Sequence, residues 1–405
     1  MKSSLAGLAI ATIFLSCLNA NAETVAPSPK SFEQWCQQKN SLPAATKKTV
    51  EALLKESGTQ DCKLANIKLN SLLELNLSGN QISDLKPLAG LSNLTSLELS
   101  GNQITDVKPI AGLTNLTKLR LLSNQISNVK PLANLSNLTE INLGENKIND
   151  IQPLASLTNL TALNLSVNQI RDIQPLASLT NLNILSLSGN QIIDVKSLSG
   201  LTNLTLLNLA ANQIKDIKPL AGLNKLMRLN LFKNQINDIK PLADFTNLTL
   251  LELSNNQISN VKPLVDLTKL IELHFSNNQI SDVKPLVGLK NLTLLDLSTN
   301  QIKDVKPLAS LSNLMSLKLS NNQIGDVKHL MGLTNLNSLE LSNNQISDVK
   351  PLSGLDNLYE LRLSNNKIQD VKPLASFSKS SKLYVLNLDG NQIIEKTCPA
   401  KFCMF

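Results

Sequence analysis

An asparagine returns every 22 residues through most of this chain, and this period determines what the chain can fold into. It occurs at fourteen positions from Asn80 to Asn366 in equal steps of 22, and a fifteenth, Asn391, follows after a step of 25. Residues 91–112 show the unit, L-x-x-L-x-x-L-x-L-x-x-N-x-I-x-x-V-x-x-I. One such unit cannot bury its apolar side chains alone, so neighbouring units must stack. The 405 residues therefore predict one long solenoid instead of two or three globular domains.

The apolar spacing inside each unit predicts a short strand followed by a tight return. Leu97, Glu98 and Leu99 alternate with a period of two, which is typical of a strand with both leucines inside. After Asn102 the apolar spacing widens to three, which suits a 3₁₀-like return. The position seven residues after the asparagine is proline in twelve of fourteen units. Because proline cannot donate a hydrogen bond to a sheet, this position indicates the irregular convex side.

The repeated asparagine is interpreted as a structural ladder. Its side-chain amide both donates and accepts hydrogen bonds, so a stack of such amides satisfies backbone groups that the turn leaves without sheet partners. Losing one amide would leave a buried polar group unpaired, at a cost of about 1–3 kcal/mol. Asn-Leu-Thr triplets, such as the one at Asn93, match the glycosylation acceptor pattern. They recur with the repeat, so we interpret them as a by-product of it.

Composition and charge argue against a nucleic-acid partner. Aromatic residues make up 3% of the chain, which suits a thin stack of leucines, and the formal charge is +7. A lysine recurs at one position of the repeat, as at Lys108, with an acidic or polar residue two positions before it, as at Asp106. Nucleic-acid binding favours unbalanced basic charge together with stacking aromatic side chains. Neither is present, and no nucleic acid is expected as a partner.

Residues 1–22 have the features of a signal peptide. A basic start, an apolar stretch too short to span a membrane comfortably and a small-x-small motif precede Glu23. The prediction is an exported protein, secreted, periplasmic or on the cell surface, with no transmembrane segment. Cys17 leaves a lipoprotein anchor open as an alternative, although Leu15 is larger than lipoprotein signals prefer at that position. Residues 23–31 are expected to be a short linker.

Residues 32–68 depart from the repeat and are predicted to be an N-terminal cap. The end of a solenoid exposes an apolar face that must be covered. Residues 46–55 have helical spacing, and Gly58 is expected to end that helix. The repeats are placed at 69–394, with a C-terminal cap at 395–405. The side chains expected to cover the first repeat are Phe32, Trp35, Val50, Leu53 and Leu54.

Four cysteines outside the leader lie in the two caps, as Cys36, Cys62, Cys398 and Cys403. Four cysteines allow three pairings. Fifteen strands at about 4.8 Å would separate the two ends by roughly 65 Å, so pairing within each cap is favoured. We predict the disulfides Cys36–Cys62 and Cys398–Cys403. A zinc site would need four ligands in one place, so neither a metal nor a cofactor is expected.

The repeat L-x-x-L-x-x-L-x-L-x-x-N-Q-I-x-D-V-K-P-L-x-x resembles the 22-residue leucine-rich repeat of the bacterial internalin family over residues 69–394. The resemblance implies an α/β repeat solenoid: a curved leucine-rich repeat arc with a concave parallel β-sheet, convex 3₁₀ or irregular turns and a helical N-terminal cap. It also implies that proteins are bound on the concave face. No immunoglobulin-like module or wall-anchoring tail follows the repeats in this sequence, so adhesion to host cells is not carried over.

The outward positions of each strand, six, four and two residues before the asparagine, are where a partner would touch. In the middle repeats these positions carry apolar residues with charged neighbours, which is typical of a protein-binding surface. An alternative is that duplication of two repeats copied a harmless leucine, because three of these leucines lie 44 residues apart. The predicted partner-binding residues are Ile184, Leu206, Arg228, Phe232, Leu250, Glu252, Glu272, His274 and Leu294.

Two classes of function remain open on this reading. The first is a monomeric secreted or cell-surface protein that binds an unidentified protein on its concave face. The second is a structural or glycan-binding component of the cell envelope, although sugar sites favour aromatic platforms and the outward positions offer only Phe232. An enzyme is not expected, because no nucleophile and base, paired carboxylates or phosphate loop interrupts the repeat. His274 in particular aligns with no serine, cysteine or second histidine.

Overall fold

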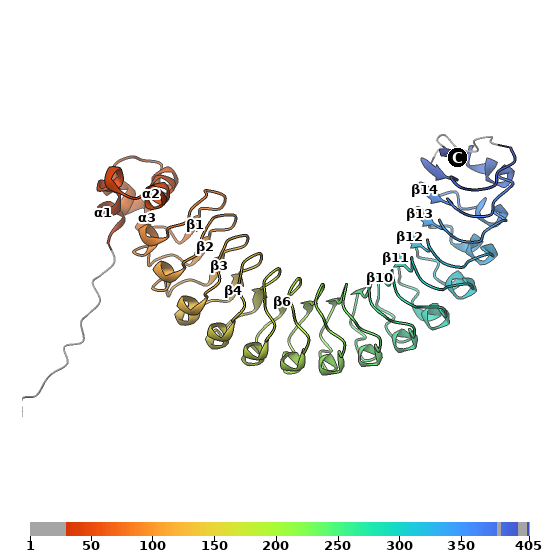
Figure 1. Cartoon of the computed structure of the whole chain (residues 1–405), viewed down its shortest axis with the longest axis horizontal. Coiled ribbons are helices and arrows are strands. Elements are labelled where there is room, and N and C mark those ends of the chain that lie inside the picture. Colours follow the sequence, from red (N-terminus) through yellow and green to blue (C-terminus); the bar gives the residue numbers. More distant parts are fainter. Residues whose placement is uncertain (1–29, 379–381, 396–402, 405) are drawn as a thin grey trace, which may run out of the picture.

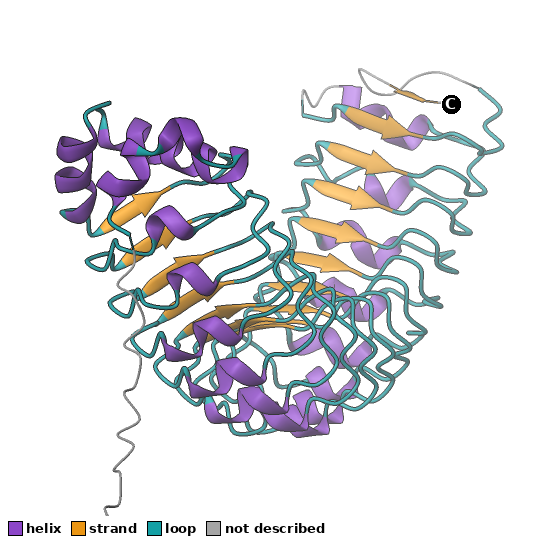
Figure 2. Cartoon of the chain, turned by 60° about the vertical axis from the view of Figure 1, so that its left-hand side comes forward, coloured by secondary structure: helices purple, strands orange, loops and turns teal. Residues whose placement is uncertain are grey.

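One curved parallel sheet forms the inner layer of an arc (Figure 1). The computed structural model describes residues 30–378, 382–395 and 403–404. Within these residues the strands follow one another in chain order, so each strand pairs only with its sequence neighbours. Short 3₁₀ helices lie on the outer side of the arc, and three α-helices cover its N-terminal end (Figure 2). The predicted fold class, a leucine-rich repeat solenoid with a helical N-terminal cap, is confirmed.

The α-helices are α1 (Phe32–Gln37), α2 (Ala44–Ser57) and α3 (Cys62–Asn70). The strands are β1 (Glu74–Asn76), β2 (Ser96–Glu98), β3 (Lys118–Arg120), β4 (Glu140–Asn142), β5 (Ala162–Asn164), β6 (Ile184–Ser186), β7 (Leu206–Asn208), β8 (Arg228–Asn230), β9 (Leu250–Glu252), β10 (Glu272–His274), β11 (Leu294–Asp296), β12 (Ser316–Lys318), β13 (Ser338–Glu340), β14 (Glu360–Arg362), β15 (Val385–Asn387) and β16 (Cys403–Met404).

The 22-residue step keeps every strand in the same register. Leu75 pairs with Leu97, and Leu97 pairs with Leu119, so the inward leucines stack directly above one another. Leu97 is 1% exposed, whereas the flanking side chains of β2 face outward and are partly exposed. At the longer step Leu361 pairs with Leu386. The three additional residues therefore leave the register of the sheet unchanged.

The repeated asparagine forms the predicted ladder. The Nδ2 of Asn102 donates to the carbonyl oxygens of Leu77 and Leu99, both at 2.9 Å, and its Oδ1 accepts from the backbone N–H of Ile82 at 2.9 Å. Leu77 and Ile82 belong to the preceding coil, so one side chain joins two coils. The same three contacts recur along the arc as far as Asn391. The physical role predicted for this position is confirmed.

A second ladder explains the glycosylation-like triplets. The Nδ2 of Asn115 donates to the carbonyl oxygen of Ser92 in the preceding coil at 2.9 Å. The hydroxyl of Thr117, two residues on, donates to the carbonyl oxygen of Thr95 at 3.1 Å. Both polar members of the triplet thus bind backbone groups one coil earlier. The triplets recur because the stack uses their side chains.

The returns on the convex side begin with an aspartate or, in two repeats, an asparagine. The Oδ1 of Asp106 accepts from the backbone N–H of Lys108 at 2.8 Å, and Lys108–Ile110 then forms a 3₁₀ helix with proline in its first turn. A proline there loses no hydrogen bond, because the first N–H groups of a helix have no partner inside it. This turn places Ile110 in the core, where it is fully buried.

The N-terminal cap contains more helix than the sequence predicts. α2 extends beyond the expected residues 46–55 to Ala44–Ser57 and ends at Gly58, whose φ of 66° suits glycine. The short helices α1 and α3 were not predicted. Four of the five side chains expected to cover the first repeat are buried, namely Phe32, Val50, Leu53 and Leu54, and Trp35 is partly buried against the same core.

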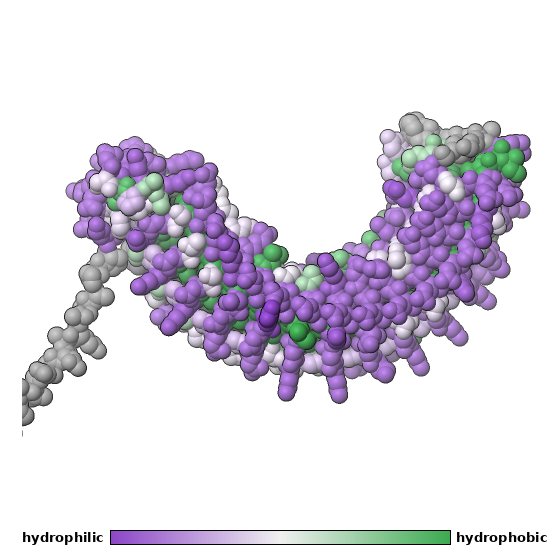
Figure 3. Space-filling model, viewed as in Figure 1, coloured by the Kyte–Doolittle hydropathy of each residue, from purple (hydrophilic) through white to green (hydrophobic). Residues whose placement is uncertain are grey.

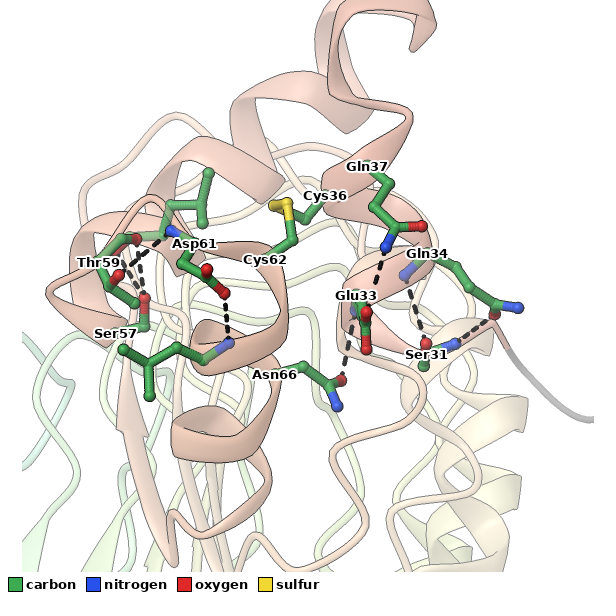
Figure 4. Close-up of a disulfide and its surroundings, with 12 residues drawn as sticks. Ser31, Glu33, Gln34, Cys36, Gln37, Ser57, Thr59, Asp61, Cys62 and Asn66 are labelled. Carbon is green, nitrogen blue, oxygen red and sulfur yellow. Dashed lines mark hydrogen bonds between the residues drawn. A yellow bond between two sulfur atoms is a disulfide. The ribbon is translucent and has the colours of Figure 1, made fainter.

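The disulfide Cys36–Cys62 joins α1 to the start of α3, with the two Cα atoms 5.5 Å apart (Figure 4). A hydrogen bond of 3.3 Å from the Glu33 N–H to Asn66 Oδ1 joins the same two helices. At the other end, Cys403 on β16 is disulfide-bonded, whereas its predicted partner Cys398 lies outside the described residues. The second pairing therefore stays a prediction.

The predicted signal peptide, including Cys17 and the cleavage site before Glu23, also lies outside the described residues. Among the residues that are described, no helix has both the length and the apolar character needed to cross a membrane.

Candidate functional site on the concave face

The predicted partner-binding residues all lie on the concave side of the middle of the arc. Eight of the nine belong to strands β6 to β11, and Phe232 follows two residues after the end of β8. None of the nine is buried in the core, and Ile184 is 45% exposed. The outward assignment of these positions agrees with the structure, because Leu229 and Leu231 beside them are fully buried. Figure 3 shows a mainly hydrophilic face of the arc with only small hydrophobic groups near its hollow.

Carboxylates surround the one histidine of this surface. His274 Nδ1 lies 3.8 Å from Glu252 on the preceding strand, and its Nε2 lies 3.8 Å from Glu272 on its own strand. Asp296 occupies the matching position of the next strand, in register with His274. The backbone N–H of Ser254 donates to Glu252 at 2.7 Å and fixes that side chain. This part of β9 to β11 therefore carries three carboxylates beside a single imidazole.

On several other strands of the concave face, opposite charges pair with each other. Arg120 donates to Glu140 at 2.8 Å, and this hydrogen bond and charge raise the pKa of Arg120 above its usual value. Lys318 lies 3.3 Å from Glu340, and Arg362 pairs with Glu360 on its own strand at 2.6 Å. The carboxylates of β9 to β11 differ from these pairs, because no lysine or arginine in the described residues lies within ion-pair distance of them.

A further exposed column was missed by the sequence reasoning. It consists of the residues seven positions before each asparagine, at the edge of the sheet where the strands begin; we call it the edge column. Seven of its fifteen members are threonine, but in the C-terminal half several are large and apolar or aromatic. The large exposed members, 42–60% exposed, are Leu73, Met227, Ile271, Met315, Tyr359 and Tyr384.

Two tyrosines of the edge column form an aromatic pair. The rings of Tyr359 and Tyr384 stack with centroids 5.5 Å apart and planes 7° from parallel. Phe232 is the one aromatic residue at the outward positions of the strands, and these two tyrosines lie next to those positions, in the edge column. The available signal was a change from threonine to tyrosine at a fixed position of the repeat. Two-residue alternation could not reveal it, because this position lies just outside the strand.

The remaining hollows lie between neighbouring returns on the convex side. One open hollow of about 630 Å³ lies between the returns that start at Lys218 and Lys240. Beside other returns, lysine and aspartate pair with each other, as Lys328 and Asp326 do at 2.8 Å, and this pairing lowers the pKa of Asp326. Within the described residues, no group of three or more histidine, cysteine, aspartate or glutamate side chains is arranged to hold a metal ion.

Comparison with known proteins agrees with this architecture. The family model for leucine-rich repeats in pairs of copies matches residues 70–112, 92–134, 114–156, 136–178, 158–201, 180–222, 268–310 and 312–357. No curated protein matches the sequence.

Several solved structures resemble the chain. The internalin InlF from Listeria monocytogenes is 37% identical, with a TM-score of 0.78, over 84% of this chain and 100% of that one. A leucine-rich repeat protein from Leptospira interrogans is 31% identical, with a TM-score of 0.74, over 82% of this chain and 88% of that one. The matching chain in the structure of PEPR1–AtPEP1 is 26% identical, with a TM-score of 0.63, over 75% of this chain and 46% of that one.

Proposed function

Because this chain belongs to the internalin-like leucine-rich repeat proteins, we propose that it is an exported, non-enzymatic protein that binds another protein on its concave face. The observation that carries the proposal is Phe232. It stands in an outward column that is otherwise mostly serine, and it is partly exposed. Large aromatic side chains and arginines are both enriched at the centres of protein interfaces, and Arg228 is exposed on the same segment.

Export is supported by two observations. The first 22 residues have the features of a signal peptide, and the cap contains the disulfide Cys36–Cys62. Disulfides form and persist in secreted, periplasmic and cell-surface proteins and are rare in the cytosol. The similarity to the structure of PEPR1–AtPEP1, whose name joins two molecules, supports the binding role. N-terminal sequencing of the mature protein tests export: a start at Glu23 supports it, and a lipid-modified Cys17 favours the membrane-anchored alternative.

A pair of neighbouring substitutions tests the binding site. Phe232→Ala should weaken capture of the partner from an extracellular or periplasmic extract by about 2 kcal/mol, with almost no change in thermal stability. Asn234→Ala should instead destabilise the fold by about 1–3 kcal/mol, because Asn234 joins two coils through bonds of 3.0 Å to Leu209 and to Ile214. If Phe232→Ala unfolds at as low a temperature as Asn234→Ala, Phe232 is part of the core and the proposed site is wrong.

A glycan-binding role in the cell envelope is the second candidate, favoured by the stacked pair Tyr359–Tyr384. Sugars pack against aromatic side chains, and these two are about half exposed. Binding of purified envelope polysaccharide to the wild type, lost in Tyr359→Ala and kept in Phe232→Ala, would favour this candidate. Binding of a protein partner that is lost in Phe232→Ala and kept in Tyr359→Ala would support the protein-binding role.

A further inference from the structure

Two rows of apolar side chains interleave along the edge of the concave sheet. The first row lies at the first position of every second strand, at Leu206, Leu250 and Leu294 on β7, β9 and β11. The second lies in the edge column of the repeats between them. We call the six residues of both rows the apolar stripe: Leu206, Met227, Leu250, Ile271, Leu294 and Met315.

The apolar stripe has one member in each of six successive repeats. Each member lies one strand further along the arc than the one before, and parallel strands are about 4.8 Å apart, so the stripe is about 24 Å long. The members of the edge column are well exposed, at 49%, 42% and 49% for Met227, Ile271 and Met315. The same position is threonine in the neighbouring repeats, as at Thr249 and Thr293.

Copying of repeats does not account for the stripe. Duplication of two repeats reproduces residue identity, and it suffices for the identical leucines at 206, 250 and 294. In the edge column the identity changes from methionine to isoleucine and back to methionine, while the large apolar character stays. The apolar character is thus kept across repeats whose side chains differ, and grouped exposed apolar side chains tend to mark interaction sites.

Acidic side chains lie beside the middle of the stripe. Glu252 and Asp296 end the strands β9 and β11, which begin with Leu250 and Leu294. Glu272 begins β10 and directly follows Ile271. The groups facing them are His274, between Glu252 and Glu272, and Lys318 on the next strand, whose ammonium group lies 3.3 Å from Glu340. Arg228 adds one positive charge on β8. The local surface therefore carries a surplus of negative charge on a chain whose formal charge is +7.

We infer that the apolar stripe and its three carboxylates bind one extended segment of a partner protein in which apolar residues alternate with lysine or arginine. This inference rests on the proposed function and specifies its partner. An extended segment fits because the sheet curves along the stripe (Figure 1), and a straight helix cannot follow that curve. About seven extended residues span 24 Å. Apolar side chains of the segment cover the stripe, and its basic side chains meet the carboxylates.

The test uses a defined probe, an acetylated and amidated nonapeptide of alternating leucine and lysine with a fluorescent label, and measures binding by fluorescence anisotropy. Met227 and Ile271 are changed together to threonine, the usual residue of their column, so the fold is kept. Glu272→Gln removes one carboxylate. The matched controls are Met331→Thr, an exposed apolar residue on a convex return, and Glu74→Gln, at the position of Glu272 but on β1.

The double threonine variant should bind the probe at least tenfold more weakly than the wild type, and Glu272→Gln at least threefold more weakly. Both controls should bind like the wild type, and raising the salt concentration from 50 to 300 mM should weaken binding, because exposed charges are screened. The inference is overturned if the wild type does not bind the probe, if the controls lose as much as the stripe variants, or if a leucine–glutamate probe binds equally well. If a captured partner needs Phe232 but not the stripe, the proposed function stands without this inference.

Discussion

Left-handed backbone recurs at one residue of each repeat, directly before the asparagine. Glycine fills this position in some repeats, as at Gly101 with φ 67°, and asparagine in others, as at Asn343 with φ 56°. Both residue types tolerate this conformation better than most. Val167 occupies the same position with φ 54° and is 54% exposed. For a β-branched residue this backbone is strained, and the exposed side chain contributes little packing to offset the strain.

Replacement of Val167 by asparagine should therefore stabilise the protein by about 1 kcal/mol. The reverse change, Asn343→Val, should destabilise it by a similar amount and serves as the matched control. Urea unfolding followed by circular dichroism measures both. A Val167→Asn variant no more stable than the wild type, alongside a destabilised Asn343→Val variant, would show that the valine makes a compensating contact.

Among elements, the N-terminal cap depends on its disulfide more than the repeats depend on any single bond. α1 has six residues and α3 has nine, so neither helix is stable alone. Cys36–Cys62 joins them across 26 residues of sequence. Fixing a loop of that size in the unfolded chain is worth about 3.5 kcal/mol. The repeats are instead held by a ladder that is repeated in every coil.

Changing Cys36 and Cys62 together to alanine should consequently loosen the cap before the arc. Trp35, the single tryptophan of the chain, lies in α1 and reports on the cap by its fluorescence. Far-ultraviolet circular dichroism reports mainly on the arc. In urea the fluorescence transition of the double variant should precede the circular dichroism transition, whereas the two should lie closer together in the wild type. Coincident transitions in the variant would mean that the cap holds without the disulfide.

Prediction from sequence succeeded for the elements that recur in every repeat, because the repeats can be compared with one another. The strand around Leu97, its inward partners and the role of Asn102 could be derived because each column repeats. α1, α3 and β16 occur once, and no periodicity points to them. The edge column was missed for a different reason. Alternation identifies the sides of a strand, but Met227 and Tyr359 precede their strands, where the backbone turns and the alternation ends.

At the scale of the whole molecule, the arc is built from coils of 22 residues, so its length can change by whole coils. Each coil contacts its neighbours, and stability in such a stack is approximately the sum of repeat and interface contributions. Removing residues 303–324 takes out one full unit and joins equivalent positions of two coils. Removing residues 303–313 joins the start of a return to the segment that precedes a strand. The positions joined are not equivalent, so the register of the sheet and the asparagine ladder are broken.

The 22-residue deletion should keep a cooperative thermal transition and an unchanged circular dichroism signal per residue, with a slightly lower melting temperature. The 11-residue deletion should lose strand signal and broaden the transition, because the C-terminal coils no longer stack. Equal behaviour of the two deletions would mean that the returns absorb changes in length freely. The tolerated 25-residue step before Asn391 shows only that three additional residues are accommodated on one return.

The chain-order pairing of the strands also has a mechanical consequence. No strand bridges distant parts of the arc in the sheet as described, so a force applied between the N-terminal cap and β15 passes through every junction in turn. Because the junctions between coils bear the force one after another, their small deformations add, and the whole arc is less stiff than any single junction. A rotation too small to break a ladder bond at a single junction adds up over the arc to a large change in the width of its mouth. Small rotations at many junctions can therefore change the width of the arc while each coil stays nearly rigid.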